Sequence, residues 1–356
     1  MFNFPLRDIK SMSEKQWMIL NSFFNKDIID PTKIHQEHKK RSIRTKYDYI
    51  SIHIHIDKYE YVFSRFNLSR YLRACQIPPN IAVDISRRIK EILVDEGILE
   101  ITQEEFEKRV IGLMSFYDSS SLFKRRFKLI QRFNFERVPL IIFISGTGFT
   151  GKSSLAFQLG ERLNISTILQ TGIIKSLSNG IDDHLNMSLW DNPQDESFFE
   201  QYEKECDIVQ KGIEGDIYKT ITDGKPLIIE GIHLNPSRFL TQCGGNSILP
   251  LDCFKLPTMN RIAEGKQGFI LPILVKDSSN SIYQQILNFW RIQNRNMEIL
   301  SIQKLFTYVL ELQDYLESMF PSSFVIDVST TNPTDRIHSI FLDKLEQCYG
   351  DQSEIY

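Results

Sequence analysis

The sequence predicts an α/β fold with a mainly parallel sheet, preceded by a smaller and mostly helical unit. From Pro139 onward, short apolar runs alternate with amphipathic helical segments, which is the pattern of a parallel sheet covered by helices. Between residues 63 and 117 the apolar spacing is helical instead. The chain has 356 residues, of which 42% are hydrophobic. This length and composition predict two domains with buried cores.

The N-terminal part divides into three segments. Residues 1–48 form an N-terminal extension that ends in the basic run HKKRSIRTK, which is either a solvated linker or a phosphate-binding patch. Residues 49–118 form the helical unit, in which a strand over the run YDYISIHIHI precedes three helices. His53 and His55 share one face of that strand, as exposed polar residues or as two metal ligands. Residues 119–137 are basic and amphipathic, and we expect a linker helix.

Residues 138–350 make up the α/β domain. Buried apolar runs predict strands at 139–145, 166–170, 226–230, 269–275 and 324–328. Helical periodicity predicts helices at 152–163, 198–222, 280–318 and 334–347. Residues 241–268 have little periodicity, and we expect a surface insertion or lid.

Charge and composition exclude several classes of protein. Lys and Arg number 42 against 45 Asp and Glu, so the formal charge of −3 argues against a chain that coats nucleic acid or an anionic membrane. No apolar run approaches the ~18 residues of a membrane span. The start, MFNFPLRDIKSMSEK, has no signal or transit character, and the five cysteines form no CxxC pair. We therefore expect a cytoplasmic protein in a reducing compartment.

The most informative motif is GTGFTGKS at residues 146–153, a full match to GxxxxGK[ST]. It follows a buried strand and opens an amphipathic helix, so its main-chain N–H groups and the helix N-terminus are placed to bind phosphates. Lys152 is expected to reach the β and γ phosphates, and Ser153 to ligate Mg²⁺. The alternative is a glycine-rich turn without a ligand. The nucleotide-binding residues are predicted to be Gly146, Thr147, Gly148, Phe149, Thr150, Gly151, Lys152, Ser153 and Ser154.

A carboxylate and a histidine follow another predicted strand. Glu230 ends the apolar run PLIIE, and ligands of parallel sheets bind at the carboxyl ends of strands. We predict that Glu230 serves Mg²⁺ through water or polarises an acceptor hydroxyl, with capping of the next turn as the alternative. His233 is either a substrate ligand or a structural residue.

The motifs in this order resemble the 2-phosphoglycerate kinase family, which includes the plant low-phytic-acid P-loop protein. The resemblance covers most of residues 50–345 and is carried by GTGFTGKSS, by LIIEGIHLNP and by ELQDYL at 311–316. The segment FSRFNLSRYLRACQIPPNIAVDISRRIKEIL is similar to the ATP-cone-like domain that precedes the kinase domain in that family. The resemblance implies a P-loop kinase-like fold, ATP and Mg²⁺ as cofactors, and transfer of the γ-phosphoryl group to a small phosphorylated acceptor.

Several departures from the family pattern fall on the acceptor side. After the second strand the family has Thr-Asp and then Ile-Arg, whereas this chain reads TGIIK, so the acid is missing and Lys175 keeps a positive charge. On the lid helix the family's His and two Arg match Tyr283, Ile286 and Trp290, although Arg291 and Arg295 lie close by. The predicted substrate residues are therefore Thr171, Lys175, His233, Arg291 and Arg295.

Two functions remain open on this evidence. The first is an ATP-dependent small-molecule kinase in which Lys152 and Glu230 are catalytic. The second is a degenerate kinase-fold subunit or scaffold of a larger assembly that binds nucleotide with little or no catalysis. Loss of one arginine that faces a migrating phosphoryl group costs roughly a thousandfold or more in rate, so the acceptor-side departures decide between the two.

Overall fold

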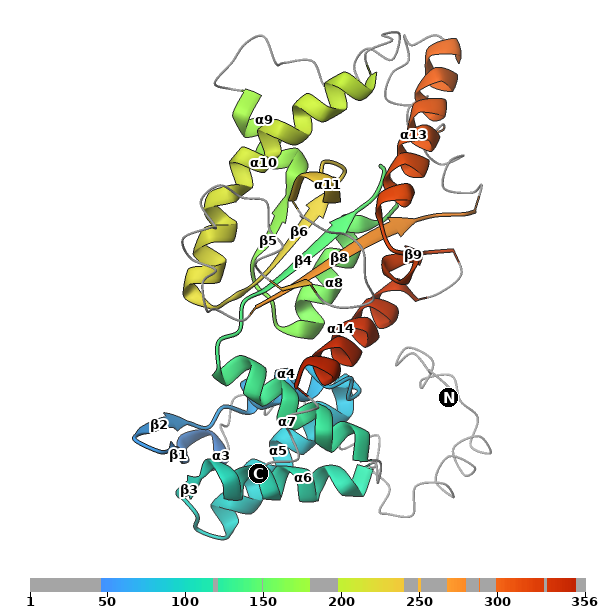
Figure 1. The fold of residues 1–356 in the computed structure, drawn as a ribbon. Coiled ribbons are helices and arrows are strands. Elements are labelled where there is room, and N and C mark those ends of the chain that lie inside the picture. Colours follow the sequence, from blue (N-terminus) through green and yellow to red (C-terminus); the bar gives the residue numbers. More distant parts are fainter. Residues whose placement is uncertain are drawn as a thin grey trace, which may run out of the picture.

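The computed structural model describes residues 46–117, 121–148, 150–179, 198–239, 249–250, 268–279, 288, 299–329 and 332–349 (Figure 1). The predicted N-terminal extension, the insertion at 241–268 and the first half of the helix expected at 280–318 lie almost wholly outside these residues.

The α/β domain is built on five parallel strands, and all five were predicted. In space their order is β5, β6, β4 and β8, with β9 paired to the end of β8. A short antiparallel strand, β7 (Leu249–Pro250), pairs with the start of β8 and was not predicted. Every residue of β4 is buried, as expected for a central strand covered on both faces. The parallel strands are β4 (Leu140–Ser145), β5 (Ile168–Gln170), β6 (Pro226–Gly231), β8 (Phe269–Lys276) and β9 (Val325–Asp327).

Helices cover both faces of the sheet, as the periodicity predicted. Ile142 and Ile144 of β4 pack in one cluster with α8 and α14, while Ile141 and Phe143 pack in another with α10. This alternation follows from the two-residue repeat of a strand. The P-loop kinase-like α/β architecture expected from the sequence is consistent with this arrangement. The helices are α8 (Lys152–Leu163), α9 (Thr171–Asn179), α10 (Phe198–Asp223), α11 (Pro236–Phe239), α13 (Ile299–Met319) and α14 (Pro333–Tyr349), with a 3₁₀ turn η5 (Ser322–Phe324).

The N-terminal unit has the three expected helices, but more strand than expected. Three short strands form a sheet in the order β2, β1, β3, where the sequence indicated one. All four residues of β2 are exposed, so this edge strand shows no apolar alternation. The unit and its connector comprise α3 (Lys46–Tyr49), β1 (His53–Ile56), β2 (Tyr59–Val62), α4 (Arg65–Ala74), α5 (Pro79–Asp95), β3 (Glu100–Thr102), α6 (Gln103–Tyr117) and α7 (Ser121–Phe135).

The helical unit packs against the end of the sheet where the strands begin, and one apolar cluster runs through both (Figure 1). We call this contact region the seam. Buried Arg126 of α7 contacts Gln76, Asp343 and Glu346 there. On α14, His338 donates from Nε2 to the carbonyl of Ala74 at 2.8 Å. The division of the chain at residues 119–137 stays a prediction, because the two units share this core.

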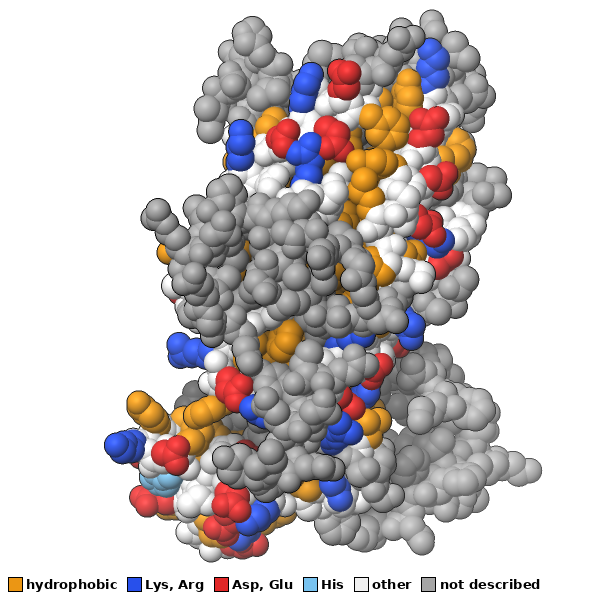
Figure 2. All heavy atoms as spheres, in the orientation of Figure 1, with side chains coloured by type: hydrophobic (Ala, Val, Ile, Leu, Met, Phe, Trp, Pro, Cys, Tyr) orange, Lys and Arg blue, Asp and Glu red, His pale blue; other side chains and the backbone are white. Residues whose placement is uncertain are grey.

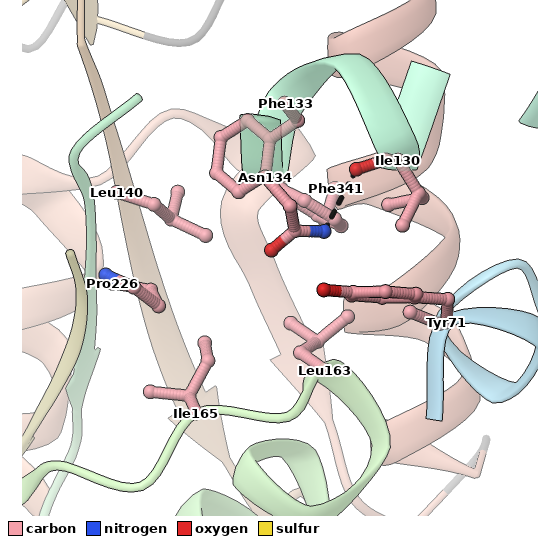
Figure 3. A pocket seen from close by; sticks show the side chains of 10 residues that line it. Tyr71, Ile130, Phe133, Asn134, Leu140, Leu163, Ile165, Pro226 and Phe341 are labelled. Atoms are coloured by element: carbon pink, nitrogen blue, oxygen red, sulfur yellow. Dashed lines mark hydrogen bonds between the residues drawn. The ribbon is translucent and has the colours of Figure 1, made fainter. Parts of the chain in front are cut away.

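A small cavity lies in the seam. Figure 3 shows the hydroxyl of Tyr71 and the amide of Asn134 pointing into it among apolar side chains. Leu140 and Pro226, the first residues of β4 and β6, also line it. Its volume of about 20 Å³ has room for about one water molecule, so the cavity is a packing feature of the seam.

Candidate functional site

The loop GTGFTGKS, which we predict to bind phosphates and call the phosphate loop, joins β4 to α8 at the carboxyl edge of the sheet. Gly146 has φ of 145°, and a Cβ atom at this position would lie 2.3 Å from the carbonyl oxygen of Val275. Only glycine therefore lets β4 turn here against β8. The loop ends at Gly151, after which α8 begins at Lys152 with its partial positive charge directed at the loop. Ser154 is exposed on the first turn of α8, and Phe149 lies outside the described residues.

The Lys152 side chain is buried and folded back on the loop. Its Nζ donates to the carbonyl of Thr147 and lies 3.4 Å from Oγ1 of Thr150. Burial lowers the pKa of Lys152 to about 8, and the negative charge of Glu230 opposes that shift. Because an anion beside a buried ammonium favours its charged form, a phosphate group in this loop would raise the pKa of Lys152 again.

Glu230 lies next to the loop, as the sequence predicted. It is 4% exposed, and Ser153 donates from Oγ to Glu230 Oε1 at 2.7 Å. The register of the sheet explains this placement, since Glu230 of β6 pairs with Ile144 of β4, two residues before the loop. A hydroxyl and a carboxylate are the hard oxygen ligands that Mg²⁺ takes beside phosphate oxygens and water. No group of three His, Cys, Asp or Glu residues with metal-binding spacing occurs in the described ranges.

Three of the predicted substrate residues come together around an acid that the sequence did not indicate. His233 lies 3.0 Å from Thr171 through Nδ1 and 3.0 Å from Glu205 through Nε2. Lys175 donates from Nζ to the other carboxylate oxygen of Glu205 at 2.8 Å. All four side chains are at least nine-tenths buried. We refer to these four residues as the Glu205 cluster.

The Glu205 cluster adjoins the phosphate loop through Gly231. This glycine follows Glu230 and has φ of 149°. A Cβ atom there would lie 1.7 Å from Thr171 Oγ1. Any side chain at position 231 would therefore push Thr171, the first residue of α9, away from the end of β6. The close approach of Gly231 and Thr171 therefore places the Glu205 cluster directly beside the loop and Glu230.

Charge within the Glu205 cluster is balanced. Burial raises the pKa of Glu205, but the hydrogen bonds from His233 and Lys175 outweigh burial, so the pKa lies below its ordinary value. The ionised carboxylate then faces the ammonium of Lys175 in an ion pair with little access to solvent. The prediction that Lys175 serves the acceptor stays a prediction, and in this structure its ammonium is already in contact with a carboxylate of the same protein.

The turn after β6 is held by a second polar network. Buried Asn235 donates to Glu203 and lies 3.4 Å from the hydroxyl of Tyr315, and Arg238 pairs with Glu203 and Asp207. This network joins α10, α11 and α13 around the site. In the space-filling view, acidic and basic side chains gather over α10 and α11, and apolar side chains run beside them toward α13 (Figure 2).

Two of the predicted substrate residues, like Phe149 of the loop, cannot be placed. Arg291 and Arg295 lie outside the described residues, so their predicted contact with substrate stays a prediction.

The helices that are described include none long and apolar enough to cross a membrane.

Comparison with known proteins confirms the resemblance to 2-phosphoglycerate kinases. No family model matches the chain. The enzyme of Methanopyrus kandleri is 29% identical over 190 residues, which cover 50% of this chain and 58% of the relative. The one from Methanocaldococcus jannaschii is 28% identical over 190 residues, covering 50% and 61%, and the one from Pyrococcus horikoshii is 28% identical over 195 residues, covering 51% and 64%. The chain thus spans less than two thirds of the length of these curated relatives.

Proposed function

We propose that this protein is an ATP-dependent phosphotransferase that moves the γ-phosphoryl group of ATP to a small phosphorylated acceptor. The observation that carries the proposal is the adjacency of the phosphate loop, Glu230 and the Glu205 cluster at one edge of the sheet. A kinase needs a triphosphate and an acceptor side by side, and this edge offers a candidate site for each. The similarity to proteins named 2-phosphoglycerate kinase supports the same reaction class.

The roles of the loop residues follow from phosphate chemistry. Lys152 and the main-chain N–H groups of the loop would hold the phosphates, with Lys152 exchanging the carbonyl of Thr147 for a phosphoryl oxygen. Ser153 and Glu230 supply the oxygen ligands for Mg²⁺, directly or through water. The bound metal would neutralise charge on the migrating phosphoryl group. Glu230, which accepts a hydrogen bond from Ser153, would also polarise the hydroxyl of the acceptor.

The acceptor would bind at the Glu205 cluster. Thr171, His233 and Lys175 carry hydrogen-bonding groups suited to a phosphate ester, and Arg291 and Arg295 are the proposed further cations. Because Glu205 already offsets the charge of Lys175, affinity for an anionic acceptor would depend strongly on these arginines. 2-Phosphoglycerate is the first acceptor to test, since the relatives are named for it.

Release of ADP from MgATP, with and without 2-phosphoglycerate, tests the proposal. We expect turnover that depends on the acceptor, and a loss of roughly a hundredfold or more in Glu230→Gln, because that variant removes the carboxylate from the metal and acceptor. Glu161→Gln is the matched control, since it changes an exposed carboxylate at the far end of α8 and should act as wild type. ADP release that no phosphorylated acceptor increases would contradict the kinase proposal.

The charge balance of the Glu205 cluster favours one alternative, a nucleotide-binding subunit of a larger assembly with little catalysis. This alternative predicts that MgATP raises the melting temperature of wild type, that Lys152→Ala abolishes the shift, and that no acceptor increases ATP turnover.

A further inference from the structure

The buried side of α13 carries a polar side chain that reaches the phosphate loop. Gln313 is 6% exposed, and the hydroxyl of Thr147 donates to its Oε1 at 3.2 Å. The carbonyl of the same threonine accepts a hydrogen bond from Lys152. Gln313 and Lys152 therefore contact the same loop residue, one from α13 and the other from α8.

The other end of the Gln313 amide has no partner. Nε2 makes no hydrogen bond to any residue within the described part of the chain. Burying an N–H group without a partner costs folding free energy, so such groups are rare and need an explanation. Turning the amide over does not remove the cost, because Oε1 would then be the end without a partner.

A second polar group without a partner among the described residues, this one a hydroxyl, lies on the same face of the sheet. Ser145, the last residue of β4, is fully buried, and its Oγ has no partner among the residues described. Ser145 lies an even number of residues from Ile141 and Phe143, which pack against α10. It pairs with Leu274 of β8, which packs in one cluster with Leu312 and Leu316 of α13. Its side chain therefore lies on the face that α10 and α13 cover. It precedes Thr147 by two residues. The Gln313 Nε2 group can only donate and the Ser145 hydroxyl can also donate, so both suit a ligand rich in acceptor atoms.

We propose that Gln313 binds the terminal phosphoryl group of the nucleotide, with Nε2 donating to a phosphoryl oxygen while Oε1 keeps its contact with Thr147. The inference rests on the proposed nucleotide site and adds to it a ligand from α13. A phosphoryl oxygen accepts only and carries negative charge, so it complements an N–H group that only donates, and such hydrogen bonds are the stronger kind. A diphosphate lacks the γ-phosphoryl group and would leave Nε2 unpaired.

Calorimetric titration of the full chain with MgATP and MgADP tests the inference. In Gln313→Leu, which removes both polar ends at similar volume, we expect the affinity for MgATP to fall roughly tenfold or more and the affinity for MgADP to change less than about twofold. Gln131→Leu is the matched control. Gln131 also has an unpartnered amide atom, Oε1, but lies on α7 in the N-terminal half of the chain, and its loss should leave both affinities unchanged.

The outcomes separate this inference from the proposed function. Equal losses for MgATP and MgADP in Gln313→Leu, or no loss for either, would overturn the inference alone and leave Gln313 as a structural link to Thr147. A wild-type chain that binds neither nucleotide would overturn both proposals before any variant is compared. If the leucine variant does not fold, Gln313→Glu decides, because a carboxylate near the phosphoryl group should lower the ratio of MgATP to MgADP affinity. An unchanged ratio there would overturn the inference.

Discussion

Charged and polar side chains are buried at both ends of the parallel sheet, but their partners differ. At the seam, Arg126 and His338 find all their contacts on other elements of the protein. At the carboxyl edge, the hydrogen bonds that Lys152 makes to described residues stay within its own loop, and Ser145 Oγ and Gln313 Nε2 have no partner among those residues. This difference is what we expect if the polar groups of the seam serve stability and those of the carboxyl edge bind the ligand that we propose. On α7, Gln131 Oε1 is an exception, since it also has no partner among the residues that the structure describes.

The Glu205 cluster is the strongest test of the contrast between the seam and the carboxyl edge. It lies at the carboxyl edge, yet its charged groups pair with one another as they do at the seam. We expect Glu205→Gln to destabilise the protein by about 3–5 kcal/mol, since the ammonium of Lys175 would stay buried without its anion. Urea unfolding measures the change. Glu203→Gln, two residues away on α10 with a side chain 33% exposed, should cost about 1 kcal/mol because Arg238 keeps Asp207. Equal costs for the two variants would show that Glu205 is not a buried counter-ion.

The seam predicts a pH dependence of stability. Burial lowers the pKa of His338 to about 4, although its hydrogen bond to Ala74 opposes the shift. The unfolded chain, with a histidine pKa of about 6.5, therefore takes up the proton first as the pH falls, and stability is lost between about pH 6.5 and pH 4. The loss should reach about 3 kcal/mol.

The free energy of unfolding measured across this range, in wild type and in His338→Gln, isolates the histidine. Glutamine keeps an N–H donor for the Ala74 carbonyl but does not titrate, so the variant should lose less stability on acidification. Parallel curves for the two proteins would mean that another group governs the acid range.

An ion pair at the solvent-exposed edge of the seam should give the smallest change in stability. Arg73 of α4 pairs with the exposed Glu161 of α8 at 3.3 Å, and Arg73→Ala should cost less than about 1 kcal/mol. Glu161 lies nine residues beyond Lys152, or about 14 Å along the helix, so nucleotide affinity should stay the same. A changed affinity for MgATP would show that the seam and the phosphate loop are coupled through α8, which would weaken the contrast between the two ends of the sheet.

The five parallel strands could be predicted because each lies in a short apolar run between helical segments, although only β4, β6 and β8 are largely buried. The edge strand β2 could not, since Tyr59, Tyr61 and Val62 are exposed and show no alternation of burial. The helix α3 was expected to be the start of a strand, because the β-propensity of Tyr47 and Tyr49 favours an extended chain. Whether a short surface segment becomes a helix or a strand thus depends more on the elements that it contacts than on the propensities of its own residues.

The candidate site shows the same limit. Lys152, Ser153 and Glu230 could be found because a motif and the end of a strand identify them. Glu205 could not, since α10 carries several acids and only the packing of the helix selects the one that is buried. Gln313 lies in ELQDYL, which supported the resemblance, but nothing in that segment indicates contact with Thr147. Residues such as Glu205 and Gln313 are identified by contacts between elements that are distant in the sequence, and a single segment does not contain that information.

The central claim is that the loop around Lys152 binds the triphosphate of a nucleotide, and calorimetric titration with MgATP tests it most directly. We expect saturable heat for wild type and an affinity roughly a hundredfold lower for Lys152→Ala, which removes charged hydrogen bonds to the phosphates. The variant should fold at least as well as wild type, because burying the ammonium lowers its pKa and so works against folding. No heat with wild type, or equal affinity in the folded variant, would contradict the claim.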